Sequence, residues 1–304
     1  MLRRRAPRAE NAAARLTDRK ERPSGRAFPP RGGDIGCLEQ PVHPQSETSQ
    51  PVRLPRMSTF VLVHGAWQST GTWDLLTPLL TKRGHQVITP VLRGLGIDQG
   101  RLSPDITLTQ HIEDVSRALS QSTEKVVLVG HSYAGMIISG VAETNAHQIH
   151  GLVFLDAFIP DDGQSVLDLL PSEIAAYFRK VARENGDGWR LAGGEGQLDL
   201  WGLKPGLARN FVRERLCDFS LRCFEEAIRI PENRKAGIPT TFVAGVAEGY
   251  PARPFFAPFA DKARASGWEL AEVKTGHDCH VERPEEVANI LLARLQRSHP
   301  SQSK

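Results

Sequence analysis

The sequence predicts an α/β fold in which a mostly parallel central sheet is flanked by helices. Three observations support this prediction. Short apolar runs rich in β-branched residues alternate with longer helical patterns, three of these six runs contain no polar residue, and one late interval of over eighty residues has no convincing strand, which predicts a helical cap inserted late in the sheet. An uninterrupted apolar run is typical of a parallel strand, because helices cover such a strand on both faces. The 304 residues suffice for one domain of this kind with an additional segment.

The expected strands and helices follow one another in regular order. The strands are expected at Phe60–Val63, Val87–Thr89, Val126–Val129, Leu152–Leu155, Thr241–Ala244 and Leu270–Val273. The helices are expected near Trp73–Arg83, Thr109–Gln121, Tyr133–Thr144 and Pro284–Gln296. The last helix begins with Pro284 and two glutamates, and both residue types are favoured in a first helical turn.

The interval between the fourth and fifth strands predicts an inserted helical cap over residues 161–235. It contains two amphipathic stretches, around Ile174–Val181 and Leu207–Ile230, with glycine-rich segments between them. The core is then expected to consist of residues 57–160 and 236–304. Aromatic residues are frequent in the cap, and we expect some of them to shape an apolar pocket. They are Phe178, Trp189, Trp201, Phe211, Phe219 and Phe224.

Residues 1–56 differ in composition from the rest of the chain. They carry eleven Arg and one Lys against six acidic residues, and they hold eight of the 21 prolines. A segment of this kind buries too little apolar surface to offset its ordering entropy, so we expect a disordered N-terminal extension. Residues 57–304 carry 26 basic and 29 acidic side chains, so the expected folded part has no basic excess of the kind that nucleic-acid binding requires.

Several further classes are excluded by what the sequence lacks. No apolar run approaches the length of a membrane span, and the N-terminal segment has no apolar region of a secretory signal. The four cysteines are sparse and form no CxxC pair, which argues against a disulfide framework and a zinc site. We therefore expect a cytoplasmic protein whose partner is a small-molecule substrate, with neither nucleic acid nor membrane span involved. The oligomeric state stays open.

The strongest chemical signal is the segment Gly130-His131-Ser132-Tyr133-Ala134-Gly135. It directly follows the buried strand at Val126–Val129 and opens a helix, which is the context of a nucleophile elbow. The sharp turn requires small residues two positions before and after the serine, and Gly130 and Ala134 meet this requirement. We therefore predict that Ser132 is a nucleophile exposed at the carboxyl end of the sheet.

Donors for a developing oxyanion are expected from a second loop. His64-Gly65-Ala66-Trp67 ends the first strand, where such a loop presents backbone N–H groups. The N–H groups of Ala66 and of Tyr133 are the predicted oxyanion hole. His64 itself is interpreted as a structural residue, because it precedes the nucleophile in the chain.

The general base is expected after the last strand, in Gly276-His277-Asp278-Cys279-His280. His277 follows the strand and a glycine, which suits a side chain directed toward the elbow. His280 lies nearer the next helix and is interpreted as a packing or capping residue. His277 is therefore preferred over His280 as the base.

The acid that orients this histidine has two candidates. Such an acid usually follows the strand before the histidine strand, and Glu248 is the carboxylate in that loop. Asp156, which ends the strand Leu152–Leu155, is the alternative, although it could instead be a structural residue at the entry to the cap. On chain order, Glu248 is preferred over Asp156.

Taken together, these residues resemble the α/β-hydrolase superfamily. The segments 60–67, 84–87, 94–96 and 130–135 look more narrowly like a group of small esterases with the HGAW motif. This group includes plant methylesterases, hydroxynitrile lyases and bacterial pyrethroid-type or aryl esterases. The similarity covers residues 57–304. It implies that His277, followed seven residues later by Pro284, is the family histidine, and that Glu248 stands where the family has Asp.

The same resemblance separates two branches of the group. Its hydroxynitrile lyases have Thr at the position of Gly65 and Lys directly after the catalytic histidine. This chain has Asp278 after the histidine, so the positive charge is replaced by a carboxylate. The resemblance therefore implies a hydrolase rather than a lyase.

The predicted activity is hydrolysis of small lipophilic carboxylic esters through an acyl-enzyme intermediate. Ser132 attacks, His277 is the base, and neither a metal ion nor an organic cofactor is required. Two alternatives stay open. One is a non-catalytic ligand-binding protein with the same fold, and the other is an amide, carbamate or lactone hydrolase with the same triad.

Overall fold

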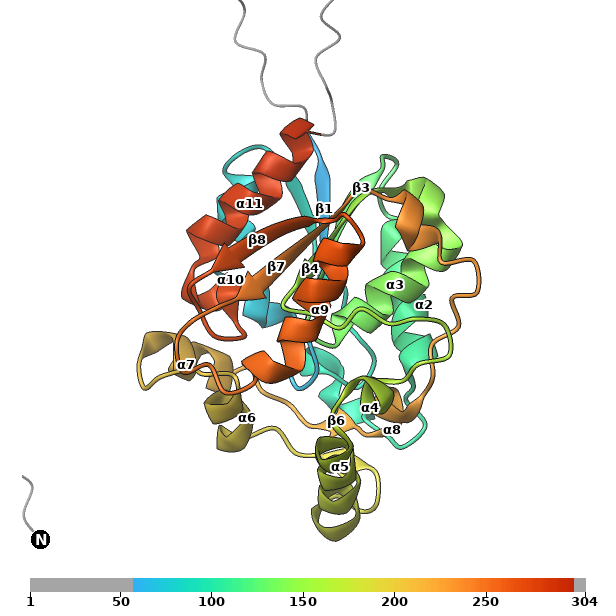
Figure 1. The fold of residues 1–304 in the computed structure, drawn as a ribbon, viewed down its shortest axis with the longest axis vertical. Coiled ribbons are helices and arrows are strands. Elements are labelled where there is room, and N and C mark those ends of the chain that lie inside the picture. The colour runs from blue at the N-terminus through green and yellow to red at the C-terminus, as the bar shows by residue number, and fades with distance from the viewer. Residues whose placement is uncertain (1–56, 298–304) are drawn as a thin grey trace, which may run out of the picture. The chain divides into compact units, whose positions relative to one another are not determined.

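The computed structural model describes residues 57–297, so the predicted disordered extension over residues 1–56 lies outside the described part of the chain. The centre of the fold is a sheet that lies between helices (Figure 1). Its six strands follow the spatial order β2-β1-β3-β4-β7-β8. The strands are β1 (Thr59–Val63), β2 (Gln86–Ile88), β3 (Val126–His131), β4 (Ile149–Leu155), β7 (Thr240–Gly245) and β8 (Glu269–Val273). Every neighbouring pair is parallel, which confirms the predicted fold class.

Both faces of the sheet are covered, which explains why the runs Phe60–Val63, Val126–Val129 and Leu152–Leu155 contain no polar residue. Successive side chains of a strand point to opposite faces. In β1, Val61 and Val63 pack into one hydrophobic core, whereas Phe60 and Leu62 pack into a second core on the other face. All four side chains are fully buried.

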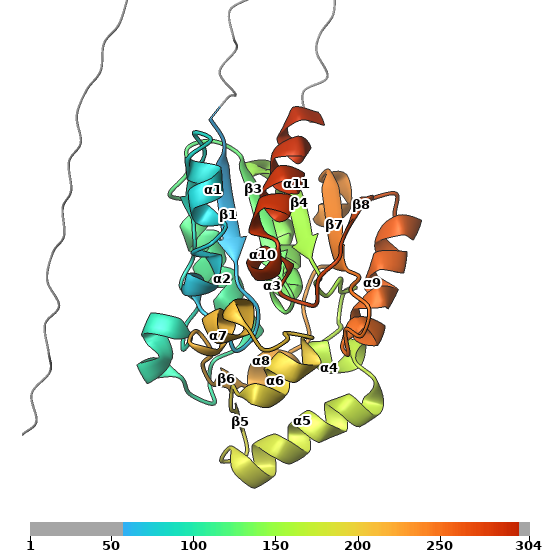
Figure 2. The same ribbon diagram turned by 90° about the vertical axis from the view of Figure 1, so that its left-hand side faces the viewer.

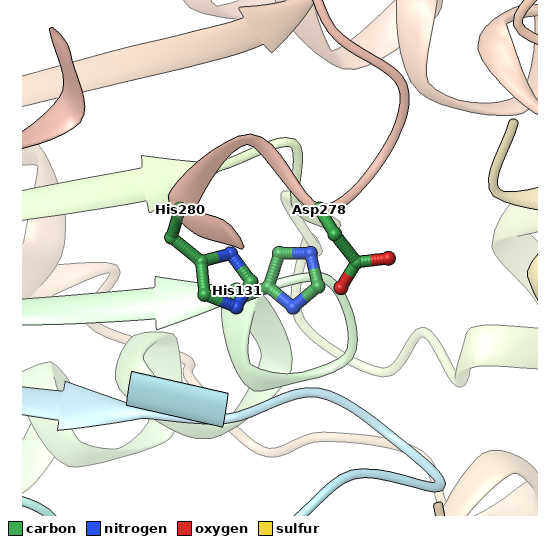
Figure 3. A group of neighbouring side chains, drawn as sticks. All are labelled: His131, Asp278 and His280. Carbon is green, nitrogen blue, oxygen red and sulfur yellow. The ribbon is translucent and has the colours of Figure 1, made fainter. Parts of the chain in front are cut away.

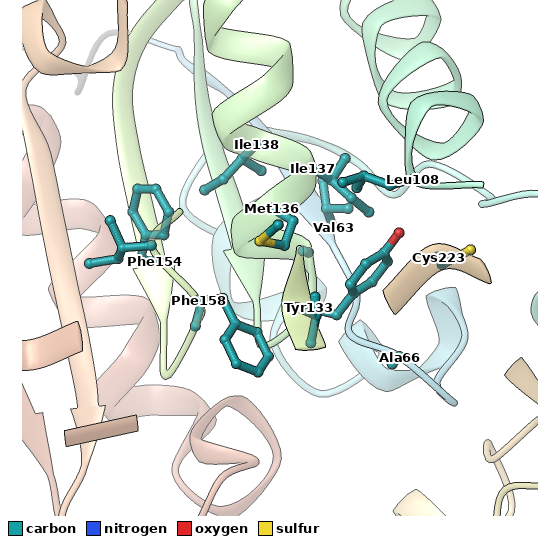
Figure 4. Close-up of a cluster of buried hydrophobic side chains, with 14 of the residues drawn as sticks. Val63, Ala66, Leu108, Tyr133, Met136, Ile137, Ile138, Phe154, Phe158 and Cys223 are labelled. Atoms are coloured by element: carbon teal, nitrogen blue, oxygen red, sulfur yellow. The ribbon is translucent and has the colours of Figure 1, made fainter. Parts of the chain in front are cut away.

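The helices form two layers. Residues of α2 (Leu108–Leu119), α3 (Ala134–Asn145) and α9 (Arg253–Ala265) belong to the first core, and residues of α1 (Thr77–Thr81) and α11 (Pro284–Arg297) belong to the second. Figure 4 shows part of the first core, with Met136 and Ile137 of α3 and Phe154 of β4. No helix within residues 57–297 has both the length and the apolar character needed to cross a membrane.

The segment between β4 and β7, residues 161–235, is hereafter called the insertion. Its elements are α4 (Val166–Leu169), α5 (Ser172–Asn185), β5 (Arg190–Leu191), α6 (Glu195–Leu200), α7 (Leu207–Arg213), β6 (Phe219–Ser220), α8 (Arg222–Glu225) and the start of η4 (Arg234–Gly237). Figure 2 shows its helices beyond the carboxyl ends of the core strands. The strands β5 and β6 pair antiparallel, so the stretch expected as helical around Leu207–Ile230 is broken by a strand.

Two helices differ from the sequence prediction. The helix expected near Trp73–Arg83 is divided into the short 3-10 helix η1 (Thr70–Trp73) and α1, which has Pro78 in its first turn. Helix α9 was not predicted, because Pro258 lies inside it and an interior proline usually interrupts a helix. The other short helices are η2 (Gly96–Arg101), η3 (Ala146–Gln148) and α10 (Cys279–Glu282).

The start of α3 approaches the chain after β4 so closely that only glycine fits at position 135. A Cβ atom on Gly135 would lie 2.1 Å from the carbonyl oxygen of Phe158. We expect Gly135→Ala to lower the free energy of unfolding by about 2 kcal/mol or more, because backbone on both sides would have to move. Urea denaturation would measure the change. Gly100→Ala is the control, because its Cβ would meet nothing within 4 Å. Equal stability of the two variants would contradict the expectation.

Candidate active site

The turn between β3 and α3 holds Ser132 in a left-handed backbone conformation, with φ at +58°. This conformation is uncommon for a residue with a side chain, so it requires support from neighbouring groups. The N–H of Ser132 donates to the carbonyl of Leu155 (3.1 Å), and its own carbonyl accepts from the N–H groups of Gly135 (3.0 Å) and Phe158 (3.2 Å). A Cβ atom on Gly130 would lie 2.8 Å from the carbonyl oxygen of Ala134. The geometry is that of a nucleophile elbow.

His277 lies in the loop between β8 and α10 and is fully buried. Its Nδ1 atom lies 2.7 Å from Oδ2 of Asp156. A carboxylate only accepts, so Nδ1 carries a proton, and in the neutral imidazole Nε2 then presents a free lone pair. Nε2 is buried and has no hydrogen-bond partner within the described residues. The arrangement is suited to a general base.

Asp156 follows β4 directly and is almost completely buried. Its N–H donates to the carbonyl of Val243 on β7, and its Oδ1 atom accepts from the N–H of Gly245 (3.1 Å). Its Oδ2 atom accepts from His277 and from the hydroxyl of Tyr250 (2.6 Å). The carboxylate therefore has a donor at both oxygens, which offsets the cost of burying its charge.

The structure places the two candidate acids differently relative to His277. Glu248 lies in the expected loop after β7, but it is exposed, and the carboxylate against His277 is that of Asp156. The reason is the course of this loop. Gly249 has φ at +71°, and the chain then turns Tyr250 inward to the site instead of Glu248.

Sequence reasoning missed Tyr250 altogether. The signal available for Asp156 was its place directly after a buried strand, but only the pairing of β4 with β7 brings that strand end toward the histidine loop. No motif in the sequence indicated a tyrosine at this site.

The loop predicted to supply the oxyanion donors packs against the elbow. A Cβ atom on Gly65 would lie 2.9 Å from Cβ of Ser132, so only glycine permits this approach. Ala66 and Tyr133, whose N–H groups are the predicted donors, are both buried. His64 is buried as well, and burial lowers its pKa to about 4. It is therefore neutral near pH 7, which fits a structural residue.

Trp67, the next residue of this loop, is held in place by the insertion. Its φ of +60° is unfavourable for a bulky residue. The indole N–H donates to the carbonyl of Leu191 (3.1 Å), and the N–H of Cys217 donates to the carbonyl of Trp67 (2.7 Å). The insertion thus fixes the backbone next to Ala66.

Aromatic side chains of the insertion surround Trp67. Four of the six aromatic residues that were expected to shape a pocket have ring contacts with its indole, at centroid distances of 5.4 to 6.3 Å: Phe178, Trp201, Phe219 and Phe224. The ring of Trp201 also lies 5.8 Å from the ring of His277. Aromatic rings of the insertion therefore surround Trp67, and one of them also contacts the candidate base.

Behind the site, three buried polar side chains lie close together: His131, Asp278 and His280 (Figure 3). The Nδ1 atom of His131 lies 3.2 Å from Oε1 of Gln68, and its Nε2 atom lies 3.1 Å from the carbonyl oxygen of His277. Gln68 also donates to Oδ1 of Asp278 (2.5 Å). A metal ion bound here through His131 would have to displace one of these contacts. Through Gln68, these side chains instead connect the loop after β1, the elbow around Ser132 and the loop between β8 and α10.

His280, the alternative base, occupies a different environment from His277. Its Nε2 atom lies 3.0 Å from the hydroxyl oxygen of Thr72, and its ring lies 4.4 Å from the ring of Trp73. Burial and the neighbouring His277 lower the pKa of His280 to about 3. These contacts support its interpretation as a packing residue.

The comparison with known proteins decides the family. The model of the alpha/beta hydrolase family matches residues 60–290. The chain belongs to the alpha/beta hydrolase family. A carbendazim hydrolyzing esterase of Nocardioides is 33% identical over 250 residues, which cover 78% of this chain and 99% of that protein. The resemblance found in the sequence is thereby confirmed.

Two further relatives of this alpha/beta hydrolase agree with the assignment. Methylesterase 1 of Arabidopsis thaliana is 39% identical over 125 residues, which cover 39% of this chain and 48% of that protein. The solved structure of an extracellular alpha/beta-hydrolase from a Paenibacillus species has a TM-score of 0.67 at 24% identity, over 78% of this chain and 98% of that one. That likeness concerns the fold alone.

Proposed function

We propose that this alpha/beta hydrolase is a serine hydrolase that cleaves small lipophilic carboxylic esters through an acyl-enzyme intermediate. The observation that carries the proposal is the hydrogen bond between Nδ1 of His277 and Oδ2 of Asp156, which leaves Nε2 buried and without a partner. The ring of His277 lies 4.5 Å from the ring of His131, the residue before Ser132 in the elbow. In this proposal the triad is Ser132, His277 and Asp156. Glu248, preferred from the sequence, is left out because it is exposed.

The first half of the reaction forms the acyl-enzyme. Nε2 of His277 takes the proton of the Ser132 hydroxyl while the oxygen attacks the ester carbonyl. The N–H groups of Ala66 and Tyr133 donate to the resulting oxyanion. The imidazolium is stabilised by the Asp156 carboxylate, and it then gives its proton to the leaving alcohol as the intermediate collapses.

The second half releases the acid. A water molecule takes the place of the alcohol, and His277 removes its proton as it attacks the acyl carbonyl. Collapse of the second tetrahedral intermediate returns the proton to Ser132 and frees the carboxylic acid. No step requires a metal ion or an organic cofactor.

The preference for lipophilic substrates rests on the aromatic surroundings of Trp67. In this proposal the insertion acts as the cap that shapes the substrate pocket. The name of the carbendazim hydrolyzing esterase and the methylesterase names of the plant relatives favour ester cleavage over ligand binding without turnover. The cytoplasmic location stays a prediction.

A substrate panel tests the proposal. We expect the full-length protein to hydrolyse p-nitrophenyl acetate and p-nitrophenyl butyrate, and the butyrate to be preferred because aromatic rings surround Trp67. Amides, carbamates, lactones and carbendazim itself belong in the same panel. Turnover of one of these compounds without turnover of esters would favour the alternative of an amide, carbamate or lactone hydrolase. Binding of the esters without any turnover would favour the ligand-binding alternative.

A further inference from the structure

The hydroxyl of Tyr250 reaches the centre of the pair formed by His277 and Asp156. It lies 2.6 Å from Oδ2 of Asp156 and 3.1 Å from Nδ1 of His277. Tyr250 is only 5% exposed and comes from the loop after β7, the loop in which the family acid was expected. We propose that Tyr250 is a positioning residue that fixes the Asp156 carboxylate and favours the state in which Asp156 is ionised and the imidazole of His277 is neutral. This inference rests on the proposed function.

The direction of the hydrogen bonds follows from the chemistry of the three groups. The Asp156 carboxylate can only accept, so both the Tyr250 hydroxyl and Nδ1–H of His277 donate to the same oxygen, Oδ2. Burial and the neighbouring Asp156 raise the pKa of Tyr250 well above its ordinary value. The hydroxyl therefore keeps its proton throughout the working range of an esterase.

Two donors fix the orientation of the carboxylate. The N–H of Gly245 holds Oδ1 and the Tyr250 hydroxyl holds Oδ2, so the plane of the carboxylate is set before His277 contributes. Rotation of the carboxylate would lengthen its bond to Nδ1 and loosen the imidazole. The position of Nε2, the proposed base, depends on that bond.

The same hydrogen bond affects protonation of the pair. A donor to the carboxylate stabilises the state in which Asp156 is ionised and His277 is neutral. Loss of the donor makes it easier to add one proton to the pair, whether His277 or Asp156 takes it. The acid limb of the pH–rate profile should therefore move to higher pH when the Tyr250 hydroxyl is removed.

Other titratable groups face the pair, and Tyr250→Phe leaves each of them unchanged. Asp278, Cys279 and His280 come from the histidine loop and α10, and His131 comes from the end of β3. Their effects on the pH at which the pair takes up a proton are the same in the wild type and in Tyr250→Phe. A shift between the two profiles therefore reports the hydroxyl of Tyr250.

The test is the full-length Tyr250→Phe variant, assayed with p-nitrophenyl butyrate between about pH 5 and 9. We expect the acid limb of kcat/KM to shift by about 1 pH unit to higher pH. At the low-pH end of this range, kcat should be about tenfold lower than in the wild type, whereas KM should change little. The matched control is Tyr177→Phe, because Tyr177 is exposed on α5. Its profile should equal that of the wild type.

The outcomes separate this inference from the proposed function. If the wild type is active and Tyr250→Phe has an unchanged acid limb, the positioning role is wrong and the triad stands. If the wild type has no turnover, the proposed function itself fails. Should Tyr250→Phe fail to fold, 3-fluorotyrosine placed at position 250 is the second test, because its more acidic hydroxyl is a stronger donor. It should move the acid limb to lower pH, and an unmoved limb overturns the inference.

Discussion

Replacing Ser132 with alanine is expected to lower kcat for ester hydrolysis by at least about 10⁴-fold. The substitution removes the attacking oxygen, and no neighbouring side chain can replace it. Alanine keeps the Cβ atom, so the left-handed backbone at position 132 has nearly the same strain as before. Stability and substrate binding should therefore change little. Steady-state kinetics and thermal unfolding of the purified variant would measure both quantities.

A matched serine distinguishes this loss from a general disturbance of α3. Ser139 is also buried, and its hydroxyl donates to the carbonyl of Gly135 inside the same helix. Ser139→Ala should keep its turnover within a few-fold of the wild type. A fluorophosphonate probe should label the wild type at Ser132 and leave Ser132→Ala unlabelled. Undiminished turnover by Ser132→Ala would rule out the covalent mechanism.

Replacing Asp156 with asparagine should lower kcat by about 10⁴-fold at neutral pH, which makes it the second-largest expected effect. The amide of asparagine can donate to Nδ1 of His277, so the imidazole would carry its proton on Nε2 instead. A protonated Nε2 cannot take the proton of Ser132. The asparagine also lacks the negative charge that stabilises the imidazolium.

Glu248→Gln is the matched control for the choice between the two acids. It makes the same chemical change at the exposed carboxylate preferred from the sequence. Its kcat should stay within about twofold of the wild type, because the change occurs in solvent. Kinetics of the two variants on one substrate decides the question. A large loss of kcat in Glu248→Gln with little loss in Asp156→Asn would favour Glu248 as the acid of the triad.

Local sequence was sufficient for the elements whose signal is contained in a short segment. The six core strands lie where their apolar runs predicted them, with ends that differ by up to three residues. The elbow is similarly local, because a buried strand, small residues at 130 and 134, and a helix start specify the turn around Ser132. The charge pattern also separated residues 1–56 from the rest.

The tertiary structure decided the parts that depend on which segments become neighbours. The partner of His277 depends on β4 lying next to β7, and on the loop after β7 turning Tyr250 inward and Glu248 outward. Helix α9 forms despite Pro258, since packing of Phe256 and Phe259 against the first core compensates for the missing hydrogen bond.

The sequence by itself therefore determined the fold class, the family resemblance, and the positions of the candidate nucleophile and base, because each of these is written in residues that are adjacent in the chain. Only the tertiary structure placed Asp156 and Tyr250 at His277. Asp156 is separated from Tyr250 by 94 positions in the chain and from His277 by 121 positions. The order of the strands and the direction of the loops bring these residues into contact. A charge or hydroxyl acts over a few ångströms of space, so its role depends on the folded neighbours and not on its place in the chain.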